Sequence, residues 1–130
     1  MKKTLLFIAT AVTLISCQEA LEDKAEREAR EETEKNCPIV YDEMQVMDSM
    51  TFDRSTHTFG YHYRLIGKAD TISSINPEAF RSALTDAIKN ATSFRAYKDE
   101  GYNFRYVYRS DRQRGRVYWE TTIKKEDYQN

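Results

Sequence analysis

Two pairs of segments with alternating apolar residues flank one segment of helical periodicity, and this pattern restricts the chain to a small α+β fold. Residues 44–52 and 58–65 form the first pair, and residues 102–109 and 117–123 form the second. An apolar residue at every second position is typical of a β-strand with one buried face. Between the pairs, residues 76–91 place apolar side chains three and four positions apart, which indicates an amphipathic helix.

The middle segment has a clear helix start. Asn76 is a favourable capping residue, Pro77 suits the first helical position, and Glu78 places an acidic group in the first turn. The predicted apolar face consists of Phe80, Ala83, Leu84, Ala87, Ile88 and Ala91. This face should form the main contact between the helix and the sheet.

The order of these segments predicts a two-layer α+β sandwich of ββαββ topology. We expect a largely antiparallel four-stranded sheet with one main helix packed on one of its faces. One strand face should carry Met44, Val46, Met50 and Phe52, and the next should carry Phe59, Tyr61, Tyr63 and Leu65. Residues 37–130 are enough for one such domain.

The N-terminal segment has the pattern of a bacterial export signal. Lys2 and Lys3 precede a short apolar stretch, whereas a membrane-spanning helix needs about 20 apolar residues. The sequence Leu14-Ile15-Ser16-Cys17 resembles the lipobox of bacterial lipoproteins. The resemblance implies that residues 1–16 are a signal peptide that is removed, and that Cys17 carries diacylglycerol and an N-terminal acyl chain such as palmitate.

The resemblance to lipoproteins also implies an address. In enterobacterial lipoproteins, Asp directly after the lipidated cysteine favours the inner membrane, so Gln18 implies the outer membrane. The signal, the charged segment that follows it and the small α+β domain are together similar to uncharacterised lipoproteins of Bacteroidota. This likeness implies an exported protein that is anchored to the cell envelope by lipid. It does not indicate whether the domain lies on the periplasmic or the surface side.

Residues 17–36 follow the signal as the lipidated cysteine and a strongly charged segment. From residue 18 to residue 36, eight acidic side chains oppose four basic ones. Leu21, Ala25 and Ala29 form too narrow an apolar stripe to bury, although opposite charges recur at helical spacing. We therefore expect a helical or disordered spacer that holds the domain away from the membrane without packing against it.

Charge and residue spacing in the domain exclude several function classes. From residue 37 onward, 14 basic side chains oppose 13 acidic ones, whereas a nucleic-acid-binding domain is strongly basic. His57 and His62 have no metal-ligand companions at useful spacing, and no phosphate-binding loop or nucleophile elbow is present. We expect no catalytic residue, metal or cofactor. Cys37 is either a small buried residue or an exposed thiol that reacts or forms an intermolecular link.

Arginine is concentrated around the last pair of predicted strands. Arginine with tyrosine on an open sheet face is typical of an interface or of a site for acidic ligands, although arginines also decorate solvated faces. The candidate binding surface consists of Arg64, Arg105, Arg109, Arg112, Arg114, Arg116 and Tyr118.

Three functions remain open at this point. The first is a non-catalytic envelope lipoprotein whose domain binds a protein or an acidic surface. The second is an inhibitor or immunity-type protein that binds a toxin or a hydrolase. The third is a small enzyme whose site is assembled from dispersed residues such as His62, Asp48 and Tyr63.

Overall fold

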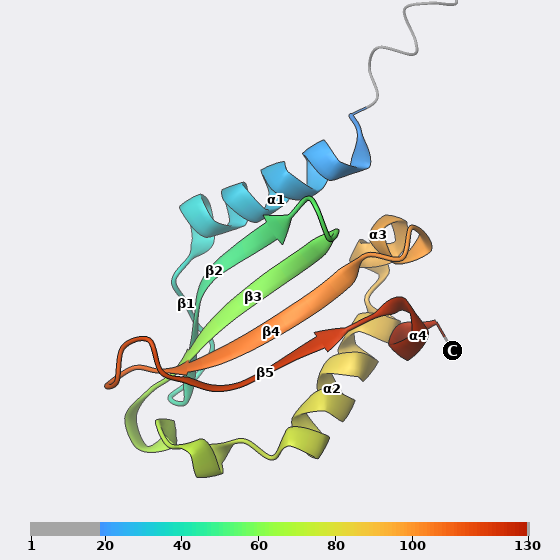
Figure 1. Cartoon of the computed structure of the whole chain (residues 1–130). Coiled ribbons are helices and arrows are strands. Elements are labelled where there is room, and N and C mark those ends of the chain that lie inside the picture. Colours follow the sequence, from blue (N-terminus) through green and yellow to red (C-terminus); the bar gives the residue numbers. More distant parts are fainter. Residues whose placement is uncertain (1–18, 130) are drawn as a thin grey trace, which may run out of the picture.

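A mixed five-stranded sheet forms the centre of the molecule, in a computed structural model that describes residues 19–129 (Figure 1). The strands lie side by side in chain order. They are β1 (Ile39–Val40), β2 (Gln45–Asp53), β3 (Thr58–Leu65), β4 (Asn103–Ser110) and β5 (Val117–Ile123). The α+β class is therefore confirmed. The prediction of a four-stranded, largely antiparallel ββαββ sheet is wrong in detail.

The middle of the sheet departs most from the predicted topology. β3 and β4 pair in parallel, whereas the other neighbouring strands pair antiparallel. Parallel neighbours need a crossover that returns the chain to the starting edge. Residues 66–102 make this crossover, and they contain the helices between the two strands. β1 was missed because a strand of two residues has no periodicity to detect.

The helices of the described residues pack on one face of the sheet and leave the opposite face uncovered (Figure 1). α1 lies along β2, and α2 lies along β5 at the other edge of the sheet. The helices are α1 (Leu21–Asn36), α2 (Pro77–Asn90), α3 (Arg95–Asp99) and α4 (Lys125–Tyr128), with 3₁₀ turns η3 (Gly67–Ala69), η4 (Ile72–Ser74) and η5 (Thr92–Phe94). Within the described residues, none of these helices is both long and apolar enough to cross a bilayer.

The strand faces beneath the helices are those that alternation predicted for β3 and β4, and for β5 from Trp119 onward, whereas Val117 of the predicted face is 42% exposed. They are lined mainly by aromatic rings, which stack across neighbouring strands. The buried side chains on these strands include Phe59, Tyr61, Leu65, Phe104, Tyr106, Tyr108 and Ile123.

β2 changes phase at a β-bulge, and the predicted face of this strand is partly wrong as a result. Met47 pairs with Tyr63, but the next regular pair joins Ser49 to His62, so Asp48 is the extra residue. The bulge turns Met47 toward the helices and Val46 toward the opposite face. Met44, which the simple alternation placed in the core, is 55% exposed.

α2 begins as predicted and has a narrower apolar face than predicted. The Asn76 side chain accepts a hydrogen bond from the Ala79 backbone N–H at 3.1 Å, as a helix cap should. Ile88 is buried, and Phe80 and Leu84 pack at the edge of the core. Ala83 and Ala87 are exposed.

α1 is a helix, which is one of the two forms predicted for this segment. The prediction that the segment does not pack against the domain is wrong. Ala25 is 0% exposed, and Ala29 is also buried. Because alanine side chains are short, the helix backbone can approach β2 closely, and a narrow stripe is enough to pack. Thr33 completes the contact, since its hydroxyl donates to the Met50 carbonyl at 2.8 Å and accepts from the Met50 N–H at 2.9 Å.

Polar contacts along α1 also join it to other parts of the domain. Arg54, in the turn between β2 and β3, forms ion pairs with Asp23 and Glu26. The His57 ring lies 2.9 Å from a Glu22 carboxylate oxygen, and the Tyr97 hydroxyl of α3 donates to Glu28 at 2.9 Å. The predicted domain, residues 37–130, therefore leaves out α1, which packs against it as part of the same folded unit. The predicted signal peptide 1–16 and Cys17 lie outside the described residues.

Candidate functional site

The predicted arginine surface lies on the helix-free face of the sheet and around the β4–β5 loop, and much of its charge is paired within the chain. Arg64 donates to Asp48 at 2.9 Å and to Asp111 at 2.7 Å. Arg105 contacts both carboxylate oxygens of Glu120 at 3.1 Å. These contacts lower the net charge that the surface presents to a partner.

Arg109 is held by a histidine instead of a carboxylate. Its guanidinium lies 3.0 Å from His62 Nδ1, and because arginine only donates, Nδ1 accepts. The ring proton is then on Nε2, which lies 3.0 Å from the Thr51 hydroxyl. Burial, followed by the charges of Arg109 and Arg105, lowers the pKa of His62. The ring is therefore neutral at pH 7 and contributes no positive charge.

Arg112 and Tyr118 meet at a buried carboxylate that the sequence analysis did not single out. Asp70 is 1% exposed, accepts from the Arg112 N–H at 2.9 Å and from the Tyr118 hydroxyl at 2.8 Å. Burial favours the neutral carboxyl, but hydrogen bonds from Arg112, Ser110 and Tyr118 hold the pKa of Asp70 well below its ordinary value. These contacts fasten the β4–β5 loop to the segment after η3, which is a structural role.

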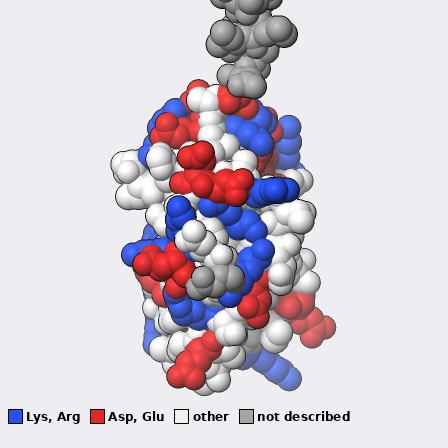
Figure 2. Space-filling view, turned by 90° about the vertical axis from the view of Figure 1, so that its right-hand side faces the viewer, with Lys and Arg blue, Asp and Glu red and all other residues white. Residues whose placement is uncertain are grey.

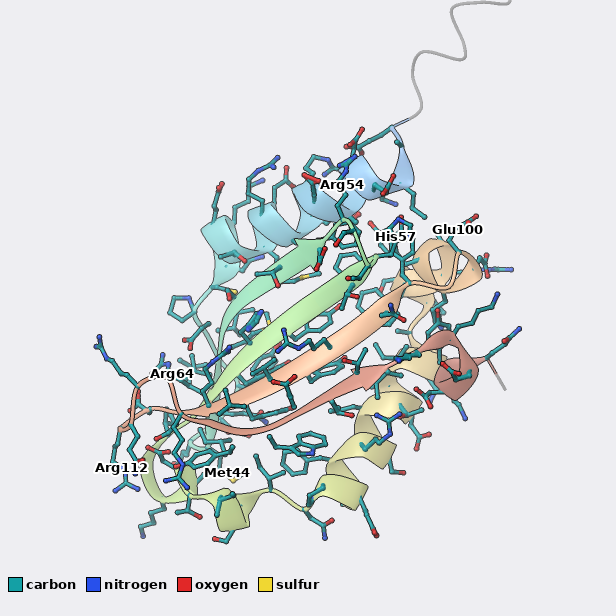
Figure 3. The ribbon with its side chains drawn as sticks, viewed as in Figure 1. Met44, Arg54, His57, Arg64, Glu100 and Arg112 are labelled. Carbon is teal, nitrogen blue, oxygen red and sulfur yellow. The ribbon has the colours of Figure 1, made fainter. Side chains whose placement is uncertain are left out.

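Arg114 and Arg116 belong to the loop between β4 and β5, and Figure 3 shows Arg112 of this loop at the same end of the sheet as Arg64. Arg116 donates to the Gln113 side chain at 3.0 Å and lies 5.1 Å above the Tyr118 ring. Arg114 is exposed and has no ion pair among the described residues. Arg64, Arg109 and Arg114 line a hollow of about 430 Å³ together with Asp48 and Asp111.

His62, Asp48 and Tyr63, the residues of the possible enzyme site, do not point to a common place. Alternation along β3 places His62 on the helix-free face and Tyr63 on the face beneath the helices. Asp48 pairs with Arg64. His57 stacks instead on Tyr102, with the ring centroids 4.6 Å apart. Among the described residues, no group of three or more histidine, cysteine or acidic side chains could hold a metal ion.

Cys37 is half-buried and forms no disulfide within residues 19–129. It packs at the edge of the core, and burial, with smaller contributions from Glu32 and Asp48, raises the pKa of its thiol. A thiol with a raised pKa is a weaker nucleophile at neutral pH.

A groove lies between α1 and the sheet, and the sequence analysis missed it. It has a volume of about 490 Å³. Tyrosines of β3 and β4 form its floor, methionines of β2 and Phe94 its apolar walls, and the C-terminal half of α1 its rim. The lining residues are Glu28, Glu31, Glu32, Lys35, Asn36, Tyr41, Met47, Met50, Tyr61, Tyr63, Phe94 and Tyr106.

The tyrosine floor results from parallel pairing of two alternating strands. Tyr61 pairs with Tyr106 and Tyr63 with Tyr108, and their rings stack at 4.8 and 4.9 Å. Side chains stand roughly perpendicular to a sheet, so stacked rings present their edges and hydroxyl groups to the space above it. Tyr41 of the β1–β2 connection covers part of this floor, with its ring 5.9 Å from that of Tyr63.

The Tyr61 hydroxyl is the unusual group in this groove. Tyr61 is 7% exposed, and its buried hydroxyl has no hydrogen-bond partner among the residues that the structure describes. Burial, followed by the neighbouring tyrosines, raises the pKa of Tyr61 well above its ordinary value, so the group stays a neutral donor. Leaving a buried polar group unpaired costs about 1–3 kcal/mol, and such groups are rare in folded proteins.

The rim of the groove is acidic. Glu28, Glu31 and Glu32 lie there with a single cation, Lys35. On the side of the molecule that carries α3 and α4, acidic and basic side chains are interleaved (Figure 2). The groove thus combines apolar walls, hydroxyl donors and carboxylates, which are groups suited to binding.

A sequence-family comparison covers most of the chain. The model of a domain of unknown function, DUF8479, matches residues 20–119, from the start of α1 into β5. No curated protein sequence gives a significant match.

Three solved structures share the fold at low sequence identity. PA3611 of Pseudomonas aeruginosa, described as a secreted protein, is 16% identical, with a TM-score of 0.69 over 85% of this chain and 99% of the other. The pilotin EpsS of the Vibrio vulnificus type 2 secretion system is 15% identical, with a TM-score of 0.64 over 84% and 92%. The pilotin AspS of the Vibrio cholerae type II secretion system is 17% identical, with a TM-score of 0.60 over 88% and 98%.

Proposed function

We propose, given that the chain belongs to the DUF8479 family of domains of unknown function, that it is a non-catalytic cell-envelope lipoprotein whose domain binds a protein partner. The groove between α1 and the tyrosine floor is the proposed binding site. Residues 17–20 are then the short link between the lipid and the folded domain.

Two observations support the envelope part of the proposal. Lys2, Lys3 and the sequence Leu14-Ile15-Ser16-Cys17 fit export and lipidation at Cys17, and Gln18 fits the outer membrane. The fold is also found in a protein described as secreted and in two pilotins of type II secretion systems. These neighbours favour a role in the envelope that is based on binding.

The Tyr61 hydroxyl is the observation that carries the binding part of the proposal. The fold retains a buried donor without a partner at the floor of a groove, although phenylalanine would fill the same space without that cost. Because this hydroxyl is covered in the free protein, a bound ligand removes the cost by moving the side chains over it and supplying an acceptor. The same group then explains why tyrosine stands at this position.

The surroundings of the groove favour a protein over a small molecule. Tyr41, at the rim, is 53% exposed, and Val40 beside it is also exposed. These apolar side chains extend the contact area outside the groove, where a small ligand would not reach them. Exposed aromatic residues beside a pocket are typical of protein interfaces.

Site-specific photo-crosslinking in the bacterium that encodes the protein tests the proposed site. Benzoylphenylalanine at position 41 should yield a discrete adduct with another envelope protein. The same group at Glu78, which is exposed in the first turn of α2, serves as the matched control and should yield none. Equal adducts at both positions, or none at position 41, would contradict a partner site at the groove.

Metabolic labelling tests the anchor separately. A fatty acid that carries an alkyne should label the wild-type protein and leave Cys17→Ser unlabelled. Equal labelling of the two proteins would exclude Cys17 as the lipid site.

The hollow lined by Arg64, Arg109 and Arg114 supports a second candidate, in which the helix-free face binds an acidic surface, as an inhibitor or immunity-type protein could. Asp48 and Asp111 in the same hollow weaken that attraction. The Arg105→Glu/Arg109→Glu variant tests it. Loss of a captured partner with an unchanged melting temperature would favour this face over the groove.

A further inference from the structure

We infer that the segment that occupies the groove is an apolar peptide stretch of the partner that carries lysine or arginine. This inference rests on the proposed function and specifies the chemistry of the partner. It follows from the charge of the rim, the composition of the walls and the free hydroxyl on the floor.

Ion pairs with lysine and arginine neutralise the rim only in part. Glu31 is shared by Arg27 at 3.4 Å and Lys35 at 3.9 Å. Glu32 accepts a hydrogen bond from Asn36 at 2.8 Å and has no ion pair among the described residues. The C-terminal end of α1, where the helix dipole is negative, adds negative potential at the same place. A cationic side chain of the partner would complete this set of contacts.

Glu28 also contributes an accessible carboxylate oxygen to the rim. One of its oxygens accepts from the Tyr97 hydroxyl at 2.9 Å, and the other lies 3.8 Å from Lys24, a long contact for an ion pair. An anionic occupant such as a phosphate or an acidic peptide would meet three carboxylates here. Charge complementarity therefore selects a basic segment.

The walls and floor are suited to the apolar part of such a segment. Met47, Met50 and Phe94 offer polarizable and aromatic surfaces, and methionine adapts to side chains of different shape. The Tyr61 hydroxyl is a donor, and a peptide carbonyl is the acceptor that every residue of a partner segment supplies. A volume of about 490 Å³ has room for a few side chains, so a segment enters the groove while the rest of the partner stays outside.

Binding of two matched peptides to the protein purified after expression of the full chain tests this inference. The first peptide is a capped dodecamer of leucine, alanine and lysine, and the second has glutamate in place of each lysine. Fluorescence anisotropy should give about tenfold tighter binding of the lysine peptide, and this preference should shrink as salt is raised. Equal affinity, or a preference for the glutamate peptide, would overturn the inference.

Variants of the rim assign the preference to the groove. Glu28→Gln/Glu31→Gln/Glu32→Gln should abolish the discrimination between the two peptides. Glu126→Gln, at an exposed position of α4, is the control and should retain it. If the triple variant fails to fold, each single Glu→Gln variant should still reduce the preference. Discrimination that survives all of these changes would place the basic peptide elsewhere.

The outcomes separate this inference from the proposed function. If position 41 crosslinks to an envelope protein while the peptides are not discriminated, the groove binds a partner and the inferred chemistry is wrong. If position 41 crosslinks only to a second copy of the chain, the occupant is the protein itself, and both the inference and the binding of a separate partner are wrong.

Discussion

The two faces of the sheet handle polar groups in opposite ways. On the helix-free face, charged side chains are abundant and are paired with one another. Arg64 pairs with Asp48 and Asp111, and Arg105 pairs with Glu120. On the face beneath the helices, tyrosine rings stack in an apolar layer, yet the hydroxyl of one of them has no partner among the described residues.

We infer from this comparison that an unsatisfied buried group is a better pointer to a binding site than an abundance of charged residues. Arginines on a sheet face find acceptors in their own chain, and exposed pairs of this kind contribute little energy. A buried donor without an acceptor costs stability in the free protein. The groove face is therefore the one whose polar groups are incomplete without a partner.

The largest expected effect concerns the layer that supports the groove face. Ile88→Ala should lower the free energy of unfolding by about 2–5 kcal/mol, because Ile88 of α2 is buried against the sheet. Ile72→Ala is the matched control, since Ile72 is exposed, and should change it by about 0.5 kcal/mol or less. Urea unfolding measures both. A similar result for both variants would mean that α2 does not cover the core.

The next effect tests whether α1 belongs to the domain. Ala25→Leu should cost about 1–3 kcal/mol, because Ala25 is fully buried against β2 and a larger side chain has no space there. Arg30→Leu on the exposed side of the same helix should have little effect on the unfolding free energy. A neutral Ala25→Leu would restore the spacer interpretation.

A pH-dependent effect tests the contacts that fasten the β4–β5 loop to Asp70. The pKa of Asp70 is lowered on folding, so its carboxylate stabilises the fold fully above the ordinary value of 3.8 and loses this contribution as pH falls toward the folded-state pKa. Asp70→Asn should therefore be less stable than wild type at about pH 7, and the difference should narrow at about pH 3. A constant difference across this range in urea unfolding would contradict the role given to Asp70.

The smallest stability effect is expected on the helix-free face. Arg105→Ala removes the exposed pair with Glu120 and should change the unfolding free energy by about 1 kcal/mol or less. Thermal unfolding at low and high salt would check this. A much larger loss would show that the helix-free face depends on its ion pairs for stability.

Local patterns predicted the elements that form through local interactions. The alternation in β3, β4 and β5 identified their buried faces, and Asn76 and Pro77 marked the start of α2. The bulge at Asp48 was not predictable in this way, because one extra residue reverses the alternation without changing the composition. The buried role of Ala25 was missed because alanine contributes little apolar surface on its own.

The groove depends on pairing between distant segments, and for that reason the sequence analysis did not find it. Tyr61 and Tyr106 are 45 residues apart and stack only because β3 and β4 are parallel neighbours. The acidic rim comes from α1, whose packing on β2 was not predicted. The arginines, by contrast, were conspicuous in the sequence, while their acceptors Asp48, Asp70 and Glu120 came from other strands and loops.

Tyr61→Phe, measured for stability and for crosslinking at position 41, tests the central claim most directly. The substitution removes only the unpaired hydroxyl, so the unfolding free energy should rise by about 1 kcal/mol while the crosslinked partner decreases severalfold. Tyr128→Phe is the matched control, because its hydroxyl already donates to the Tyr102 carbonyl at 2.9 Å, and it should lower stability without affecting the crosslink. A Tyr61→Phe variant that is less stable than wild type, or that retains its partner in full, would contradict a groove that keeps this hydroxyl for binding.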